Sequence, residues 1–431
     1  MHRAFADAPN RAPLPVEDAQ AVILESLAPL EVERVPLADC DGRVLAQEVV
    51  ADGDVPPFDR SMMDGFAVRA ADTAGASWDY PVPLAVIEEV PAGCAPKRRV
   101  GPGEAIRVMT GSMIPEGADA VVRFEYTKEE FAQNVATVHV RVPARPGDNI
   151  AKKGEDMVKG SVVLRPGVRI GAAEAAVLAT FGVAEVAVYR RPVVGILATG
   201  SELVDVNQPL APGKIRNANS YMVASLIRAA GGVPKLLAVV GDSVEAMQAA
   251  VEPYLEELDA LVTTGGVSVG DYDLIPELYE RLGATTRFWK VLARPGQPVR
   301  YAVRDGKPFF GISGNPASAY VNCQLFVLPG VRRLAGWAHP LPRTVQARLV
   351  SSYNAAPIKP DRFLRARLYE AGGELVVELA KGQSSGMIGS LVGANALVRI
   401  KGGTAVEAGQ LVDVVVCGDW PPVSREKLTT S

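Results

Sequence analysis

The chain has 431 residues, of which 48% are hydrophobic and 22% are charged. This composition is typical of a globular protein of roughly two to four domains. Its 45 Lys and Arg against 49 Asp and Glu give a net charge of -4, so its overall charge attracts neither nucleic acid nor an anionic membrane.

Histidine and cysteine are scarce, which excludes several kinds of site. They are His2, His139, His339, Cys40, Cys94, Cys323 and Cys417. Three scattered histidines exclude a three-histidine zinc site and argue against a Ser-His-Asp hydrolase. Without a C-x-x-C pair, zinc ribbons and thioredoxin motifs are excluded as well. The N-terminus lacks an apolar signal and no apolar run could span a bilayer, so we expect a cytoplasmic protein with reduced, mostly buried thiols.

The first 190 residues combine short helices with many strands. Helical spacing predicts a helix over Val16–Leu27, and the pattern becomes strand-like over residues 31–50. Pro56 and Pro57 then interrupt regular structure. Residues 80–142 read as short strands between Gly and Pro turns, and residues 172–180 as a helix. This part is therefore predicted to be rich in β structure.

From residue 191 onward, apolar runs alternate with helical segments. The runs cover residues 193–198, 236–240 and 260–263, and the helices cover residues 219–230, 243–258 and 274–282. Asn219 or Ser220 is a candidate cap for the first helix and Ser243 for the second. Such alternation predicts a doubly wound α/β domain with a parallel sheet, to which Asp305-Gly306 adds a hairpin.

After Gly336 alternating apolar and polar residues return without helices. The predicted strands cover residues 345–350, 363–368, 375–379, 396–400 and 412–416. They indicate a small antiparallel sandwich or barrel at the C-terminus.

Four loops follow the predicted parallel strands, at the sheet edge where α/β proteins bind ligands. They read TGSEL, VVGDS, TTGGVSVGDYD and GISGNPAS, and they contain Glu202, Asp242, Asp271, Asp273, Gly265, Gly266, Ser268, Gly314, Asn315 and Pro316. Glycines and a helix beginning at Pro316 suit a phosphate. Carboxylates repel a phosphate unless a hard cation lies between them, so the residues indicate a magnesium-dependent enzyme acting on a phosphorylated or nucleotide-like compound.

A simpler interpretation exists for each loop. Any one of them could be a plain strand-to-helix turn, with Asp242 as a cap or turn residue. No segment matches a P-loop or a clean G-x-G-x-x-G fingerprint. Four such loops on one edge favour a common cleft.

Segments along nearly the whole chain resemble the molybdopterin molybdenumtransferase family, which comprises MoeA and the gephyrin E-domain. Besides TGSEL, TTGGVSVGDYD and SGNPAS, the similar segments are PPFDRSMMDGFAV from Pro56, IRVMTGSMIPEGADAVV from Ile106, NIAKKGEDM from Asn149 and SSGMIGSLVGANAL from Ser384. They occur in the family's order.

The resemblance implies a four-part subunit that forms a homodimer. The parts are a linker or dimerisation domain at 11–55 and 145–188, an inserted β-rich domain at 56–144, the molybdopterin-binding α/β domain at 189–336 and a C-terminal β-barrel at 337–425. It also implies transfer of molybdenum from molybdate to adenylylated molybdopterin, with magnesium-dependent hydrolysis that releases AMP. The implied protein partners are a molybdopterin adenylyltransferase and molybdoenzymes, with neither nucleic acid nor membrane.

The family's site residues carry over by motif. Glu202, Asp242 and Asp273 would hold Mg²⁺, while Asp64, Thr110 and Asp156 match catalytic positions that reach the cleft from the partner subunit. The substrate and oxyanion positions are Gly265, Gly266, Ser268, Gly314, Asn315, Pro316, Ser318, Lys290, Arg294, Gln297, Pro298, Arg365 and Ser385.

Three positions depart from the family's pattern. Arg294 and Gln297 stand where Lys is usual, and Ser313 stands where Pro is usual. Arg keeps the charge, whereas Gln keeps only amide donors for an anion. A tungsten-inserting or slower paralogue therefore stays open, as do a molybdopterin adenylyltransferase and a non-catalytic scaffold.

Overall fold

The computed structural model describes residues 12–132, 135–266 and 274–418. The chain forms two compact units. The first consists of the chain up to Gln47, Pro166–Ala172 and the chain from Glu185 onward, and the second of Glu48–Arg165 and Ala173–Ala184. The four cysteines are unpaired, as predicted, but Cys94 is exposed. Within the described ranges, no helix is long and apolar enough to span a bilayer.

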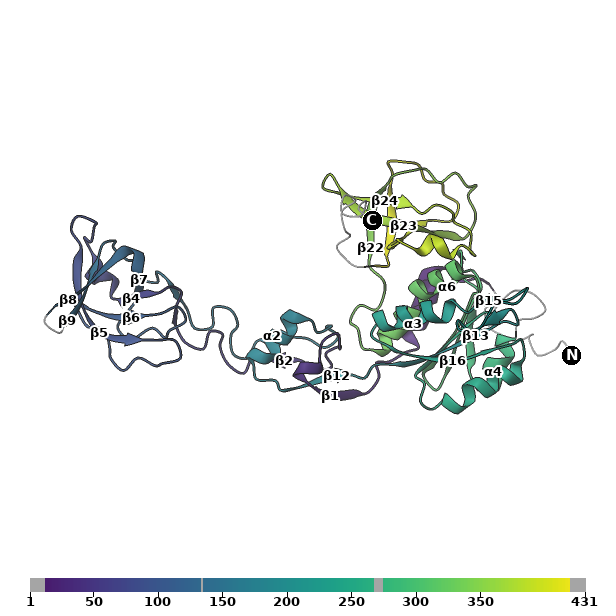
Figure 1. Ribbon diagram of the computed structural model, residues 1–431, viewed down its shortest axis with the longest axis horizontal. Helices are drawn as coiled ribbons and strands as arrows, with labels where there is room; N and C mark the ends of the chain where they lie inside the picture. Colours follow the sequence, from purple (N-terminus) through teal and green to yellow (C-terminus); the bar gives the residue numbers. More distant parts are fainter. Residues whose placement is uncertain (1–11, 133–134, 267–273, 419–431) are drawn as a thin grey trace. The chain divides into compact units, whose positions relative to one another are not determined.

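A six-stranded sheet is the centre of the first unit (Figure 1). In spatial order its strands are β16 (Val233–Val240), β13 (Val193–Thr199), β17 (Ala260–Thr264), β21 (Lys307–Ile312), β20 (Val299–Arg304) and β18 (Thr285–Trp289). The first four are parallel, and β20 and β18 are antiparallel to them. The predicted parallel sheet is confirmed.

Helices cover both faces of this sheet because β13 is apolar on both sides. Ile196 belongs to a buried cluster with the helices on one face, and Leu197 to a cluster with the helices on the other. The first face carries α1 (Val16–Glu25), α3 (Asn219–Ala229), α6 (Pro316–Asn322) and α7 (Leu328–Leu334), and the second α4 (Val244–Val251) and α5 (Ile275–Arg281). Figure 1 shows α3 and α4 on opposite sides of the sheet, so the predicted doubly wound arrangement is confirmed.

The helix ends differ from the prediction at two places. Ser243 caps α4 as predicted, but α4 ends at Val251 and a 3-10 turn over Glu252–Tyr254 follows, where Pro253 lacks the N–H that an α-helix needs. Asn219 does not cap α3. Instead Asn217 Oδ1 accepts from the Ser220 N–H at 3.2 Å.

The predicted hairpin after β20 is confirmed. Arg304 pairs with Lys307, and both residues between them have positive φ, 50° at Asp305 and 79° at Gly306. Two positive φ angles give a two-residue turn whose twist matches that of the strands.

The C-terminal strands close into a five-stranded barrel, which decides between the two predicted architectures. The strands are β22 (Thr344–Leu349), β23 (Asp361–Ala371), β24 (Glu374–Leu379), β25 (Ala396–Ile400) and β26 (Leu411–Val416). The barrel closes because β23 pairs with both β24 and β25. β22 pairs parallel with β24, so the barrel is not purely antiparallel as predicted. The two-residue strand β19 (Ala293–Arg294) of the α/β domain pairs with β23.

The second unit contains the predicted β-rich region. Its main sheet runs in the order β7 (Ala120–Arg123), β4 (Gly65–Val68), β6 (Glu104–Val108), β5 (Val82–Val90), β9 (Val135–Val140) and β8 (Thr127–Ala132). Gly65 is required in β4, since a Cβ there would lie 2.0 Å from the Val122 carbonyl oxygen.

Short elements complete the two units. They are β1 (Val32–Pro36), β12 (Glu185–Tyr189), β2 (Val49–Val50), β11 (Val162–Leu164), β3 (Arg60–Ser61), β10 (Ile150–Ala151), β14 (Leu203–Val204), β15 (Ile215–Arg216) and α2 (Ala172–Thr180). The predicted helix over residues 172–180 is confirmed. The four-part division of the chain stays a prediction, and α1, assigned there to the N-terminal part, packs on the α/β domain.

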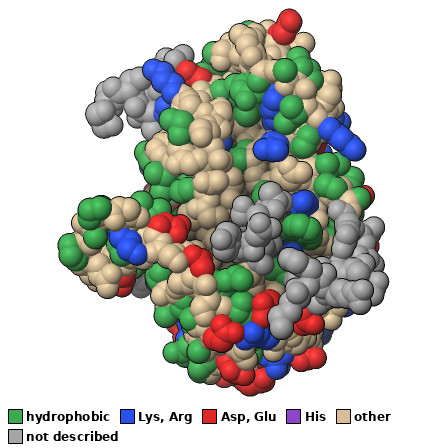
Figure 2. Space-filling model, turned by 90° about the vertical axis from the view of Figure 1, so that its right-hand side faces the viewer, with side chains coloured by type: hydrophobic (Ala, Val, Ile, Leu, Met, Phe, Trp, Pro, Cys, Tyr) green, Lys and Arg blue, Asp and Glu red, His purple; other side chains and the backbone are tan. Residues whose placement is uncertain are grey.

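Charges of both signs alternate on the surface of the α/β domain. Figure 2 shows acidic and basic side chains mixed at the bottom of the view. In the α/β domain, Arg281 pairs with both Glu245 and Glu277. Such exposed pairs contribute little to stability.

One nearly buried ion pair is expected to matter more. Asp259 accepts from both terminal nitrogens of Arg190 at 2.7 Å and from the Val193 N–H at 2.7 Å. Asp259→Ala removes the acceptor of the Val193 N–H and leaves Arg190 with Glu31 as its acidic partner, so we expect a loss of about 2 kcal/mol in the free energy of unfolding, measured by urea denaturation. Glu374→Ala, which removes the exposed partner of Arg348, should leave the urea midpoint unchanged. Equal losses in both variants would contradict the prediction.

Candidate functional site

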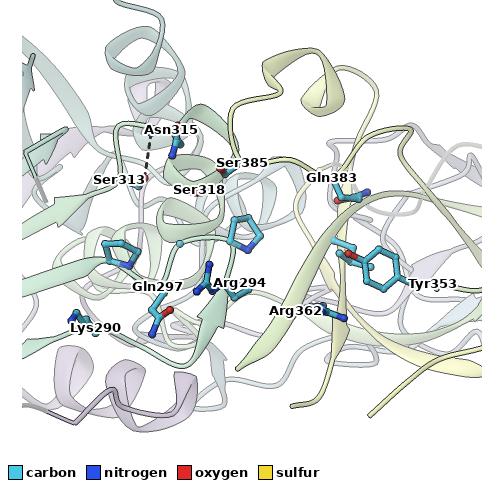
Figure 3. A pocket seen from close by; sticks show the side chains of 14 residues that line it. Lys290, Arg294, Gln297, Ser313, Asn315, Ser318, Tyr353, Arg362, Gln383 and Ser385 are labelled. Atoms are coloured by element: carbon cyan, nitrogen blue, oxygen red, sulfur yellow. Dashed lines mark hydrogen bonds between the residues drawn. The ribbon is translucent and has the colours of Figure 1, made fainter. Parts of the chain in front are cut away.

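A cavity of about 470 Å³ lies between the α/β domain and the barrel of the first unit (Figure 3). It is lined by Lys290, Arg294, Pro295, Gly296, Gln297, Pro298, Ser313, Asn315, Ser318, Tyr353, Arg362, Leu364, Gln383 and Ser385. Three of these side chains are cationic and none is acidic. The cavity is therefore suited to an anion.

The loop between β18 and β20 supplies the first wall. Lys290 has a φ of 72° and Gly296 a φ of 97°, which turn the chain sharply at the start of the loop and near its end. The Lys290 N–H donates to the Val299 carbonyl at 2.9 Å and the Val291 N–H to the Gln297 carbonyl at 3.1 Å. This closed loop presents Lys290, Arg294 and Gln297 to the cavity (Figure 3).

The start of α6 supplies the second wall. Pro316 is the first residue of the helix, as predicted. Ser313 Oγ accepts from the Asn315 N–H at 3.2 Å, so this hydroxyl holds the turn. The Ala317 N–H donates to the Ser385 carbonyl at 3.0 Å, which joins this wall to the barrel.

The barrel supplies the third wall, including three residues that the sequence analysis missed. Arg362 lies 5.3 Å from the centroid of the Tyr353 ring and donates to the Ala356 carbonyl at 2.7 Å. Gln383 pairs with the backbone of Arg365 through both its amide nitrogen and its oxygen. The alternation of side chains along β23 could have indicated Arg362, because it lies on the same face of the strand as Leu364, which lines the cavity. Nothing in the sequence around Tyr353 marks it as a cavity residue.

Arg365 has a different position from the one that the resemblance implies. It is fully buried and does not line the cavity. Its guanidinium donates to the carbonyls of Gly382 and Ser384 and to Ser390 Oγ, and burial lowers its pKa. Arg365 therefore supports the loop that carries Ser385.

The predicted metal ligands Glu202 and Asp242 follow adjacent strands, β13 and β16. Asp242 Oδ2 accepts from the Ser201 hydroxyl at 2.6 Å and N–H at 3.2 Å. Both residues are exposed. The remaining members of the predicted set, Asp273 and Ser268, lie outside the described residues. Among those described, no group of three His, Cys, Asp or Glu could hold a metal.

The loop that follows β17 contains Gly265 and Gly266 and lies close to the end of β13. Gly265 has a φ of 97°, and a Cβ there would lie 2.2 Å from the Thr199 carbonyl oxygen. Asn219 joins this loop to the next one, since its Nδ2 donates to Thr264 Oγ1 at 2.9 Å and to the Gly314 carbonyl at 2.8 Å. The structure thus brings together the predicted Gly265, Gly266 and Gly314.

The second unit contains the other predicted catalytic residues. Asp64 Oδ1 accepts from the Thr110 N–H at 2.7 Å and hydroxyl at 2.8 Å, and these two bonds lower the pKa of Asp64. Two residues that were predicted separately, from distant motifs, are thus in direct contact. Asp156 is exposed, and its N–H donates to the Val55 carbonyl at 3.0 Å.

Comparisons with known proteins define the class of the chain. Family models match in order along it: the MoeA N-terminal region (domain I and II) over residues 14–182, a probable molybdopterin binding domain over 195–333 and the MoeA C-terminal region (domain IV) over 346–417. The chain is thus a multidomain protein built around a domain of the molybdopterin-binding type.

Individual relatives cover almost its full length. It is 42% identical to a molybdopterin molybdenumtransferase of Bacillus subtilis over 96% of this chain and 97% of that protein, and 38% identical to one of Staphylococcus epidermidis over 94% and 96%. The crystal structure of a molybdopterin biosynthesis MoeA protein from Pyrococcus horikoshii matches with a TM-score of 0.80 and 33% identity, over 94% of this chain and all of that one. The chain belongs to the MoeA family.

The contact between Asp64 and Thr110 can be tested by titration. Because the pKa of Asp64 is lowered, the pair stabilises its unit above the ordinary carboxyl pKa, and this contribution is lost as pH falls through the lowered value. Thr110→Val removes the hydroxyl donor and keeps the backbone one, so the pKa of Asp64 should rise toward its usual value, measured by carboxyl-carbon NMR. Thr127→Val, in the same unit, should leave it unchanged; a shift equal to that of Thr110→Val would contradict the assignment.

Proposed function

We propose that this chain is a molybdopterin molybdenumtransferase. It takes molybdenum from molybdate and inserts it into adenylylated molybdopterin, with magnesium-dependent hydrolysis that releases AMP. The relatives named above, which cover 96% and 94% of the chain, support this activity.

The cationic cavity is the observation that carries the proposal. Molybdate is a tetrahedral dianion, and Lys290, Arg294 and Arg362 supply positive charge around a space without carboxylates. Gln297 and Ser385 add neutral donors. Charge-assisted hydrogen bonds of this kind select oxyanions over neutral ligands. Tungstate has the same charge and shape, so it is the alternative substrate.

Magnesium would bind at the other group of loops. Glu202, Asp242 and Asp273 are the proposed ligands, and the described two fit because their carboxylates are exposed and can offer oxygen ligands to a hard cation. When bound, Mg²⁺ would neutralise the pyrophosphate of the substrate. The loops at Gly265, Gly266, Ser268 and Gly314–Ser318 would bind the pterin phosphate.

The remaining parts of the proposal concern assembly. We place the protein in the cytoplasm as a homodimer, in which Asp64, Thr110 and Asp156 act on the cleft of the partner subunit. The implied partners, an adenylyltransferase and molybdoenzymes, would deliver the substrate and receive the product. The N-terminal and C-terminal MoeA regions argue against the adenylyltransferase alternative. Incubation with ATP, magnesium and molybdopterin separates the two, since accumulation of adenylylated product would favour the alternative.

Removing a proposed metal ligand should strongly slow the reaction. We expect Asp242→Ala and Asp273→Ala to reduce magnesium-dependent AMP release by on the order of 100-fold, because the pyrophosphate charge is no longer neutralised. AMP is measured by chromatography, and dimerisation by light scattering should be unchanged. Glu245→Ala, an exposed acid that pairs with Arg281, is the control and should retain activity. Full turnover in both ligand variants would remove the metal-binding role.

Gln297 offers a test of the anion site. Gln297→Lys adds a fourth cation to the cavity, so molybdate should bind more tightly by on the order of 1 kcal/mol, measured by calorimetry. The same change at Gln346, an exposed residue of β22, should have no effect. Unchanged affinity in Gln297→Lys would place the anion elsewhere.

A further inference from the structure

A single buried side chain holds the cavity loop from inside the protein. Asn322 has no exposed surface, and its Nδ2 donates to the Gly296 carbonyl at 2.8 Å. Its Oδ1 finds no hydrogen-bond partner among the described residues. The contact is close, since a Cβ on Gly296 would lie 2.8 Å from that same nitrogen.

Stability alone does not account for an asparagine at this position. Its chain neighbours Val321 and Cys323 belong to the largest apolar cluster. An amide with an unpaired oxygen in such surroundings is less favourable than an apolar side chain of similar volume. The amide is therefore best explained by what its nitrogen binds.

The helix places Asn322 directly behind the cavity. Ser318 and Asn322 are four residues apart and lie along one face of α6, and Asn315 is the residue that precedes the helix. The cavity-lining members of this set are Asn315 and Ser318. Asn322 contacts the loop that forms the opposite wall, through the Gly296 carbonyl. A π-helical turn over Cys323–Val327 begins at the next residue, and such turns are frequent at functional sites.

We propose that Asn322 is a positioning residue of the oxyanion site, a role that rests on the proposed function. By fixing the Gly296 carbonyl it sets the position of the loop that carries Arg294 and Gln297. It acts on the anion only through that loop. The substrate thus meets cations that are already in place, which lowers the entropic penalty of binding.

The test compares two buried amides of the same helical segment in the full-length protein. Asn322→Leu removes the donor to Gly296. Gln324→Leu is the matched control, since Gln324 is also buried and its Nε2 has no partner among the described residues. Hydrogen exchange is followed at the Lys290 and Val291 amides, which donate across the loop, and molybdate affinity is measured by calorimetry.

We expect exchange at these amides to become faster, and molybdate to bind more weakly, by about fivefold each in Asn322→Leu, the equivalent of one ordinary hydrogen bond. Neither quantity should change in Gln324→Leu. The loss caused by Arg294→Ala should also be smaller in the Asn322→Leu background, which a merely structural role would not produce. If leucine disturbs packing, Asn322→Ala removes the same donor without adding volume and takes its place.

The outcomes separate the two proposals. Unchanged loop exchange in Asn322→Leu overturns the positioning role, and so does faster exchange with unchanged molybdate affinity. A wild-type protein that binds no molybdate contradicts the proposed function. Wild-type binding that is insensitive to the Asn322 donor contradicts only the role of Asn322.

Discussion

The parallel pairing of β19 with β23 is the contact on which the cavity depends. It joins the α/β domain to the barrel and sets Arg294 opposite Arg362. Like charges opposite each other in a ladder repel, and Arg362 lies 5.3 Å from the centroid of the Tyr353 ring and donates to the Ala356 carbonyl. An anion in the cavity would reduce that repulsion. The pairing of β19 with β23 therefore favours the binding of a negatively charged ligand.

Buried polar groups then hold each wall of the cavity in place. Arg365 binds the carbonyls of the 382–384 loop from within the barrel, and the Ser385 carbonyl accepts from the first turn of α6. Asn322 holds the loop between β18 and β20 through the Gly296 carbonyl. These groups are paired to backbone atoms rather than to solvent, so the cavity is formed before the ligand arrives. Donors arranged in advance contribute more to binding and catalysis than donors that must be ordered.

Local chemistry explains which features the sequence could predict. The hairpin at Asp305-Gly306 and the Ser243 cap depend on neighbouring residues only, and both are confirmed. The prediction of one long helix over residues 243–258 was wrong, because it followed the apolar periodicity and disregarded Pro253. Asn219 has a typical capping side chain, yet tertiary contacts with Thr264 and Gly314 use its amide instead. Such contacts link residues far apart in the chain, where no local pattern reports them.

The same limit applies to the site. The motif segments identified the loops around the cavity, because each loop is a continuous stretch of chain. Tyr353 and Arg362 are brought to these loops only by the closure of the barrel and by the pairing of β19 with β23. Arg365 was assigned to the ligand, although side chains alternate along β23 and turn it to the face opposite Leu364, which lines the cavity. To assign a residue to a site from a motif, one must therefore also know on which face of its strand the side chain lies.

The order of the strands separates the two kinds of charge. Glu202 and Asp242 follow β13 and β16, whereas Ser313 and Asn315 follow β21, with β17 between. Adjacent strands lie about 4.8 Å apart, so the ends of β13 and β16 are roughly 10–14 Å from the end of β21 along the sheet edge. An extended substrate could place its pyrophosphate near the acids and the atoms that receive the metal near the cations, so cleavage at one end and metal insertion at the other would proceed without the two charges cancelling.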